Sequence, residues 1–303
     1  MPNIFTVFGA TGAQGGSVVN AILADPTLSK KYELRGITRD ASTPAAKALS
    51  DRGVNVVIAD MSSPESLDSA VAGSHTVFLV TNFWDTGSGS AETAQGKAVV
   101  DACKAAGVQH LIFSSLLNTS EISGDCLARI AHFDSKAAVE EYIRETGVPA
   151  TFVLLGWYME NFFQMLRKEG EGYIWSLPID GDKAQLPLID AGRDTGNFVK
   201  AALKQTVPSG KRILVATEYL TPNRIVSDLA EITGKHASAV RVSDELFKSF
   251  MPPGHGQELL ENHLLLEDPG YFGGADLGES LALLDERPRT WREFVEANKG
   301  KWA

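Results

Sequence analysis

Three glycines near the amino terminus have the spacing of a phosphate-binding loop. They stand in the stretch Gly9-Ala10-Thr11-Gly12-Ala13-Gln14-Gly15. Glycines at this spacing let the backbone turn tightly and bring its N–H groups close to a pyrophosphate. A helix that begins there adds the positive end of its dipole. The stretch therefore predicts a dinucleotide site, provided that a buried strand precedes it and a helix follows it.

Residues at the ends of the next two expected strands bear on which dinucleotide binds. The second strand ends before Arg39, where an NAD-selective site would place a carboxylate. The guanidinium fork of Arg39 suits a 2′-phosphate, so NADP(H) is favoured and NAD(H) is the alternative. Asp40 could pair with Arg39 or repel the phosphate, and Arg39 could instead be a solvated loop charge. Asp60 and Met61 could contact the adenine, or Asp60 could cap the following helix.

Apolar segments place these residues in a chain of alternating strands and helices. Expected strands cover 4–8, 34–38, 54–59, 77–81, 110–115 and 151–155, and expected helices cover 16–23, 92–106 and 135–145. Such alternation implies βαβ units and a parallel sheet. We therefore predict an α/β fold, a Rossmann-type doubly wound parallel sheet over residues 1–155, to which 191–218 return.

The regular alternation of expected strands and helices ends after Gly156. Residues 157–190 are rich in aromatic residues, glycine and proline, with one helical piece over 161–168. Helices are expected over 193–204, 221–233 and from 243 onward, with a strand over 212–216. We predict a smaller, mostly helical α+β C-terminal lobe built from 156–190 and 219–303, which covers a substrate or contacts a partner.

Composition excludes several classes of protein. The formal net charge of −10 argues against direct nucleic-acid binding, which needs clustered Lys and Arg. The two cysteines, Cys103 and Cys126, form no CxxC pair, so no metal site is predicted. No signal peptide and no membrane-length apolar run is visible, because a span needs about 20 apolar residues. We expect a cytoplasmic protein, with the nucleus as a second location.

A second constellation resembles the short-chain dehydrogenase/reductase superfamily. Ser114-Ser115 follows the fifth expected strand, and a helix that carries a lysine comes next. In that superfamily a Tyr-x-x-x-Lys pair does the chemistry, because residues four apart share a helix face. Here the stretch reads His132-Phe133-Asp134-Ser135-Lys136, so a histidine stands at the tyrosine position.

This replacement is typical of the NmrA-like family, which includes fungal nitrogen-regulatory proteins and an animal NADPH sensor. The resemblance covers essentially the whole chain, through 80–84, 95–97, 132–141 and 158–162. It implies that a set of residues contacts the cofactor: Thr81, Asn82, Phe83, Lys97, Ser114, Lys136, Tyr158, Glu160 and Asn161. Lys97 could instead be a solvated helix charge.

Three side chains are candidates for proton exchange: His132, Lys136 and Tyr158. Histidine titrates near neutral pH, but its ring is shorter than a phenol and could merely pack beside the cofactor. The missing tyrosine favours a redox sensor that binds NADP(H) and acts through a protein partner. The alternative is an NADPH-dependent oxidoreductase that reduces a small carbonyl, imine or quinone substrate. A homodimer is compatible with either function.

Overall fold

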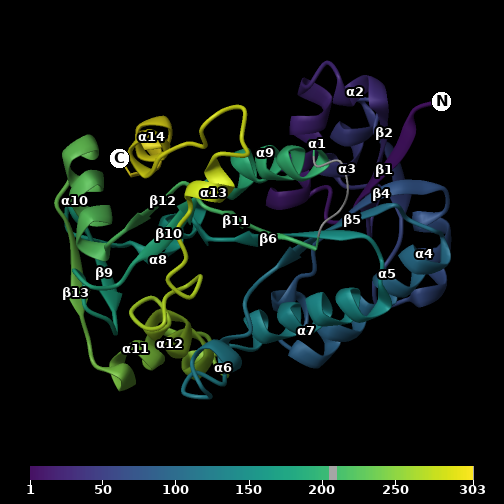
Figure 1. The fold of residues 1–303 in the computed structure, drawn as a ribbon. Coiled ribbons are helices and arrows are strands. Elements are labelled where there is room, and N and C mark those ends of the chain that lie inside the picture. The colour runs from purple at the N-terminus through teal and green to yellow at the C-terminus, as the bar shows by residue number, and fades with distance from the viewer. Residues whose placement is uncertain (205–209, 303) are drawn as a thin grey trace.

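The computed structural model describes residues 1–204 and 210–302, and its larger part is built on one parallel sheet (Figure 1). The sheet has seven strands in the order β11-β6-β5-β4-β1-β2-β3. Their bounds are β1 Asn3–Val7, β2 Tyr32–Thr38, β3 Asn55–Ile58, β4 Ser74–Leu79, β5 His110–Ser115, β6 Ala150–Leu155 and β11 Arg212–Val215. Every residue of β5 and β6 is buried, as expected of central strands that are covered on both faces. β6 is almost entirely apolar, whereas β5 has an apolar centre at 111–113 between a histidine and two serines.

Helices cover both faces of this sheet, with α1 and α9 on one face and α5 and α7 on the other (Figure 1). The helices of this part are α1 Ala13–Ala24, α2 Leu28–Lys31, α3 Pro44–Ser50, α4 Pro64–Val71, α5 Gly89–Ala105, α6 Thr119–Ile122, α7 Ala131–Thr146 and α9 Ala191–Lys204. Gly196 allows α9 to lie directly on α1, because a Cβ there would stand 2.3 Å from the carbonyl oxygen of Ser17.

The second part of the molecule contains two small sheets among short helices. The sheets have the orders β12-β10-β7 and β13-β9-β8. The strands are β7 Trp157–Tyr158, β8 Arg167–Glu169, β9 Gly172–Leu177, β10 Leu186–Ile189, β12 Glu218–Leu220 and β13 Ala237–Arg241. The helices are α8 Phe162–Met165, α10 Pro222–Thr233, α11 Asp244–Phe250, α12 Gly256–Leu264, α13 Gly278–Leu281 and α14 Trp291–Ala297, with 3-10 turns at η2 Met159–Asn161 and η3 Lys299–Trp302. A further 3-10 turn, η1 Phe83–Asp85, follows β4 in the Rossmann-type part.

The predicted Rossmann-type α/β fold is confirmed, and most of the predicted elements lie within a few residues of the observed ones. Thr221, the first residue of the helix expected over 221–233, is the N-cap of α10. Its hydroxyl accepts a hydrogen bond from the backbone N–H of Arg224. The helix predicted over 161–168 is wrong in its second half. Gly170 adopts a φ of +58°, which permits a tight hairpin turn, and β8 pairs antiparallel with β9 instead. The division into two lobes stays a prediction.

Within residues 1–204 and 210–302, no helix is long and apolar enough to cross a lipid bilayer. The same residues bring no three His, Cys, Asp or Glu side chains together as metal ligands. Cys103 is buried, Cys126 is exposed, and both are free thiols.

Candidate functional site

One large cavity of about 1000 Å³ lies at the carboxyl ends of the parallel strands. This edge is where open α/β sheets bind their ligands. Residues that follow β6 in the sequence form part of the wall. Most of the predicted site residues line it: Gly9, Thr11, Gly12, Ala13, Gln14, Gly15, Arg39, Asp60, Met61, Thr81, Asn82, Phe83, Ser114, His132, Lys136, Tyr158 and Asn161.

The glycine loop has the geometry of a phosphate cradle. Gly9 adopts a φ of +66° after β1, and its carbonyl oxygen accepts a hydrogen bond of 2.9 Å from the N–H of Gly12. A Cβ at Gly15 would stand 2.3 Å from that same oxygen, so only glycine allows α1 to begin this close to the turn. Helix α1 starts at Ala13 with the side-chain-free Gly12 as its N-cap. The loop can therefore present free backbone N–H groups to a pyrophosphate.

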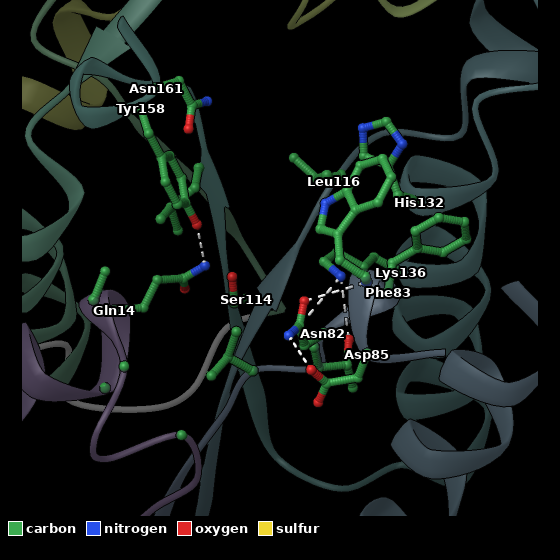
Figure 2. A pocket seen from close by; sticks show the side chains of 18 of the residues that line it. Gln14, Asn82, Phe83, Asp85, Ser114, Leu116, His132, Lys136, Tyr158 and Asn161 are labelled. Carbon is green, nitrogen blue, oxygen red and sulfur yellow. Dashed lines mark hydrogen bonds between the residues drawn. The ribbon is translucent and has the colours of Figure 1, made fainter. Parts of the chain in front are cut away.

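Arg39 forms an ion pair with Asp85 and not with its sequence neighbour Asp40. Its guanidinium lies 2.9 Å from Asp85, whose other carboxylate oxygen accepts a hydrogen bond of 2.7 Å from the amide of Asn82 (Figure 2). The side chain of Arg39 is 67% exposed. The carboxylate of Asp40 instead accepts hydrogen bonds from Ser42, which lower the pKa of Asp40. Asp40 is therefore occupied within its own loop, and Arg39 remains at the cavity.

Asp60 and Met61 both line the cavity next to the end of β3. The carboxylate of Asp60 accepts a hydrogen bond of 2.8 Å from the N–H of Ser62. The N-cap of α4 is Ser63, so Asp60 does not cap this helix. Its proposed contact with an adenine stays a prediction.

A buried ion pair holds Lys136 in place. Glu92 of α5 is fully buried, and its carboxylate contacts the ammonium of Lys136 and the hydroxyls of Ser135 and Thr81. The ammonium also lies 3.3 Å from the hydroxyl oxygen of Thr81. Burial lowers the pKa of Lys136, and the negative charge of Glu92 opposes this effect. The lysine is thus fixed at the cavity wall by β4, α5 and α7 together.

His132 is oriented by a carboxylate of helix α12. Its Nδ1 lies 2.7 Å from the carboxylate of Glu258 on α12, which also accepts a hydrogen bond from the backbone N–H of His132. Burial raises the pKa of Glu258, but hydrogen bonds from His132 and His255 outweigh burial and leave this pKa lowered. An ionised carboxylate only accepts hydrogen bonds, so Nδ1 carries a proton. The ring packs against Trp84 at a centroid distance of 5.4 Å.

Tyr158 is a partly buried tyrosine that lines the cavity. Figure 2 shows it joined to Gln14, on the other side of the view from His132 and Lys136. The hydroxyl oxygen of Tyr158 accepts a hydrogen bond of 2.5 Å from the amide of Gln14. Burial raises the pKa of Tyr158 to about 12, and the Gln14 contact opposes it. The phenol therefore stays protonated at neutral pH, and its own proton remains available to another acceptor.

Two predicted contact residues lie outside the cavity lining. The ammonium of Lys97 stands 4.7 Å from the ring centroid of Tyr142, whose hydroxyl donates to Asp101. The carboxylate of Glu160 accepts a hydrogen bond of 2.9 Å from the N–H of Gly192 and so caps the start of α9. Both residues belong to segments that the resemblance places at the cofactor. Their side chains contact neighbouring elements instead of the cavity.

Aromatic residues of 157–190 were expected to form an apolar substrate pocket, and Trp157 and Trp175 do line the cavity. Sequence reasoning missed the lining residues farther along the chain: Phe247, Asn262, His263 and Tyr271. It also missed Glu92 and Glu258, the carboxylate partners of Lys136 and His132. Neither glutamate carries a local signal, because each meets its partner only through the packing of separate helices.

The sequence model of the NmrA-like family matches residues 2–295. The NmrA-like family domain-containing oxidoreductase ptmS of Penicillium ochrochloron is 33% identical over 254 residues, which are 77% of this chain and 73% of that protein. Among solved structures, the negative transcriptional regulator NmrA has a TM-score of 0.82 at 24% identity and covers 98% of this chain and 95% of its own. The NADP(H) complex of Citrobacter sp. triphenylmethane reductase has a TM-score of 0.76 at 23% identity and covers 97% and 99%.

The two solved structures share the fold of this chain, and the family model spans nearly its whole length. The loop, the histidine in place of the tyrosine, and the lysine four residues later all stand at one cavity. The predicted resemblance is thus confirmed. The chain belongs to the NmrA-like family.

Proposed function

We propose that the chain is an NADP(H)-dependent oxidoreductase. The observation that carries the proposal is the single cavity of about 1000 Å³, which joins the glycine loop to Lys136 and to an apolar wall from the second lobe. Small-molecule sites typically measure about 300–1,000 Å³. A cavity at the upper end of that range supports a bound dinucleotide together with a small substrate.

The residues present fit a nicotinamide dinucleotide. The glycine loop would hold the pyrophosphate, and Lys136 would hold the nicotinamide ribose. Arg39 would exchange its contact with Asp85 for a 2′-phosphate, which favours NADP(H) over NAD(H). Structures of the regulator NmrA exist with NAD and with NADP, so this preference rests on Arg39 alone. When bound, the reduced cofactor supplies a hydride.

Tyr158 is the proton donor in this proposal. Its oxygen already accepts from Gln14, so its proton can pass to the oxygen or nitrogen of a reduced carbonyl, imine or quinone. The Nδ1 of His132 is bound to the carboxylate of Glu258 and is not available to a substrate. We assign His132 to positioning at the cavity wall and Lys136 to holding the cofactor.

A redox sensor that acts through a protein partner is the second hypothesis. The replaced tyrosine favours it, because the usual proton donor of the superfamily is absent. A sensor would bind the dinucleotide without turnover, whereas an oxidoreductase would consume NADPH. The cavity wall beyond Lys136 supports the oxidoreductase, since a sensor needs no substrate pocket.

Calorimetric titration with NADPH, NADP+, NADH and NAD+ is the first test, followed by NADPH consumption with a panel of carbonyls, imines and quinones. Tyr158→Phe should lower turnover by about 100-fold or more and leave NADPH affinity unchanged, because general acids contribute about 10²–10⁴-fold. Tyr142→Phe is the matched control, since its hydroxyl bonds to Asp101 outside the cavity. If NADPH binds but no compound of the panel causes its consumption, the sensor is favoured. If no dinucleotide binds, both hypotheses are refuted.

A further inference from the structure

Buried polar atoms without hydrogen-bond partners gather at the cavity. Among the residues that the structure describes, five buried side-chain atoms have none. Four of the five belong to residues that line the cavity. Three of these lie in the second lobe: Nε1 of Trp157, Oδ1 of Asn262 and Nε2 of His263. Because unsatisfied buried groups are rare in folded proteins, their concentration in one wall points to a ligand that satisfies them.

The chemistry of these three atoms is defined by their surroundings. Trp157 offers an indole N–H, which only donates. Nδ1 of His263 lies 2.7 Å from the carbonyl oxygen of Leu259, so it carries the ring proton and leaves Nε2 as an acceptor. Burial lowers the pKa of His263 to about 4, so the ring is neutral at neutral pH. Oδ1 of Asn262 is a second acceptor. The wall thus holds one donor and two acceptors.

Aromatic rings enclose these polar atoms. The ring of His263 lies between Phe247 at 4.7 Å and Trp157 at 5.3 Å, measured between centroids. Tyr271 stands 6.4 Å from Trp157. Trp157, Asn262 and His263 are 6%, 7% and 4% exposed, so each is more than nine-tenths buried. Flat apolar walls of this kind favour a planar ring over a flexible chain.

Charge is absent from this part of the lining. The Lys, Arg, Asp and Glu side chains that line the cavity are Arg39, Asp40, Asp60, Asp85 and Lys136. All five come from the Rossmann-type part of the described chain, at the ends of its strands or on α7. A charged ligand in the second-lobe wall would therefore meet no opposite charge and would lose its hydration without compensation.

We propose that Trp157, Asn262 and His263 form a substrate subsite for an uncharged planar ring that carries both a carbonyl oxygen and an N–H or O–H group. The carbonyl accepts from the indole of Trp157, and the ligand donor bonds to His263 or Asn262. This subsite is the substrate half of the cavity in the proposed oxidoreductase, and so it rests on that function. It assigns the substrate class that the family resemblance leaves open.

Two probes separate the donor from the acceptor of the ligand: 2-quinolinone, which has a carbonyl and an N–H, and 1-methyl-2-quinolinone, which lacks the N–H. Each is titrated into the full chain by calorimetry, with and without saturating NADP+. The unmethylated ring should bind about tenfold more tightly, because one neutral hydrogen bond is worth about that factor. The difference should vanish in His263→Phe or in Asn262→Leu. Trp157→Phe should weaken both probes equally, since both keep the carbonyl.

Tyr219→Phe is the matched control, because its hydroxyl bonds to the carbonyl oxygen of Ala275 away from the cavity. It should change neither probe, and no variant should change NADP+ affinity. The subsite would be overturned if the unchanged chain bound both probes equally or bound neither. It would also be overturned if the charged 2-quinolinecarboxylate bound as tightly as 2-quinolinone. Probe binding without dinucleotide binding would instead refute the oxidoreductase and leave the subsite supported.

Discussion

Replacing Glu92 by glutamine would leave the ammonium of Lys136 buried without a charged partner. The glutamine keeps the shape of the side chain, but it has one acceptor oxygen in place of the two that now accept from Thr81 and Ser135. Its NH2 group can donate to the hydroxyl oxygen of Ser135 while its oxygen accepts from Thr81. The side chains of Lys136 and Glu92 are 11% and 0% exposed, so water cannot take the place of the lost carboxylate. The variant therefore removes the negative charge of one buried ion pair at nearly constant side-chain volume.

Two estimates limit how much the free energy of unfolding falls in Glu92→Gln. Removing one member of a buried ion pair costs about 3–5 kcal/mol. Lys136 can escape by losing its proton, which at pH 7 costs about 4.8 kcal/mol relative to its ordinary pKa of 10.5 and so sets an upper limit. At about 2.1 cal/mol/K per residue, the unfolding entropy of 303 residues is about 0.6 kcal/mol/K. The expected fall in Tm is about 5–8 °C.

Thermal unfolding of Glu92→Gln and of the double variant with Lys136→Met is the assay. The double variant buries no charge, so it should be more stable than Glu92→Gln alone. The deficit of the single variant should also shrink as the pH rises, because the folded variant binds fewer protons at Lys136 than the unfolded chain does. Glu231→Gln, an exposed partner of Arg292, should leave Tm nearly unchanged. An unchanged Tm in Glu92→Gln, or a double variant less stable than the single, would refute the reasoning.

Three further changes test the site. Gly15→Ala should destabilise the chain by about 1–3 kcal/mol or more, because its Cβ meets backbone atoms at 2.3–2.9 Å, whereas Gly12→Ala, with 3.4 Å of space, should be tolerated in the same melts. Arg39→Ala should weaken NADPH about 10- to 100-fold in calorimetry and spare NADH, and equal loss for both would contradict a 2′-phosphate contact. Because the folded-state pKa of Glu258 is lowered, its contribution to stability is present above its ordinary value of 4.5 and is lost as the pH falls below it. The Tm gap between the unchanged chain and Glu258→Gln should therefore narrow in acid, and a constant gap would count against the contact with His132.

Local features of this fold could be predicted because they depend on neighbouring residues. A buried strand, three glycines and a helix start lie within one short segment, and the turn between them needs no distant partner. The same holds for Thr221 at the start of α10, whose hydroxyl bonds three residues ahead. The parallel sheet follows from the alternation of such segments, since crossover helices must cover its faces.

Only the tertiary structure decided which charges face the candidate site. Lys136 meets Glu92 across 44 residues and His132 meets Glu258 across 126, so each contact depends on which helix faces which. The apolar wall with His263 depends in the same way on where α12 docks. The sequence by itself determined a dinucleotide-type loop at the edge of a parallel sheet. The packing of separate helices determined the partners of its lysine and histidine, because long-range contacts leave no periodic trace along the chain.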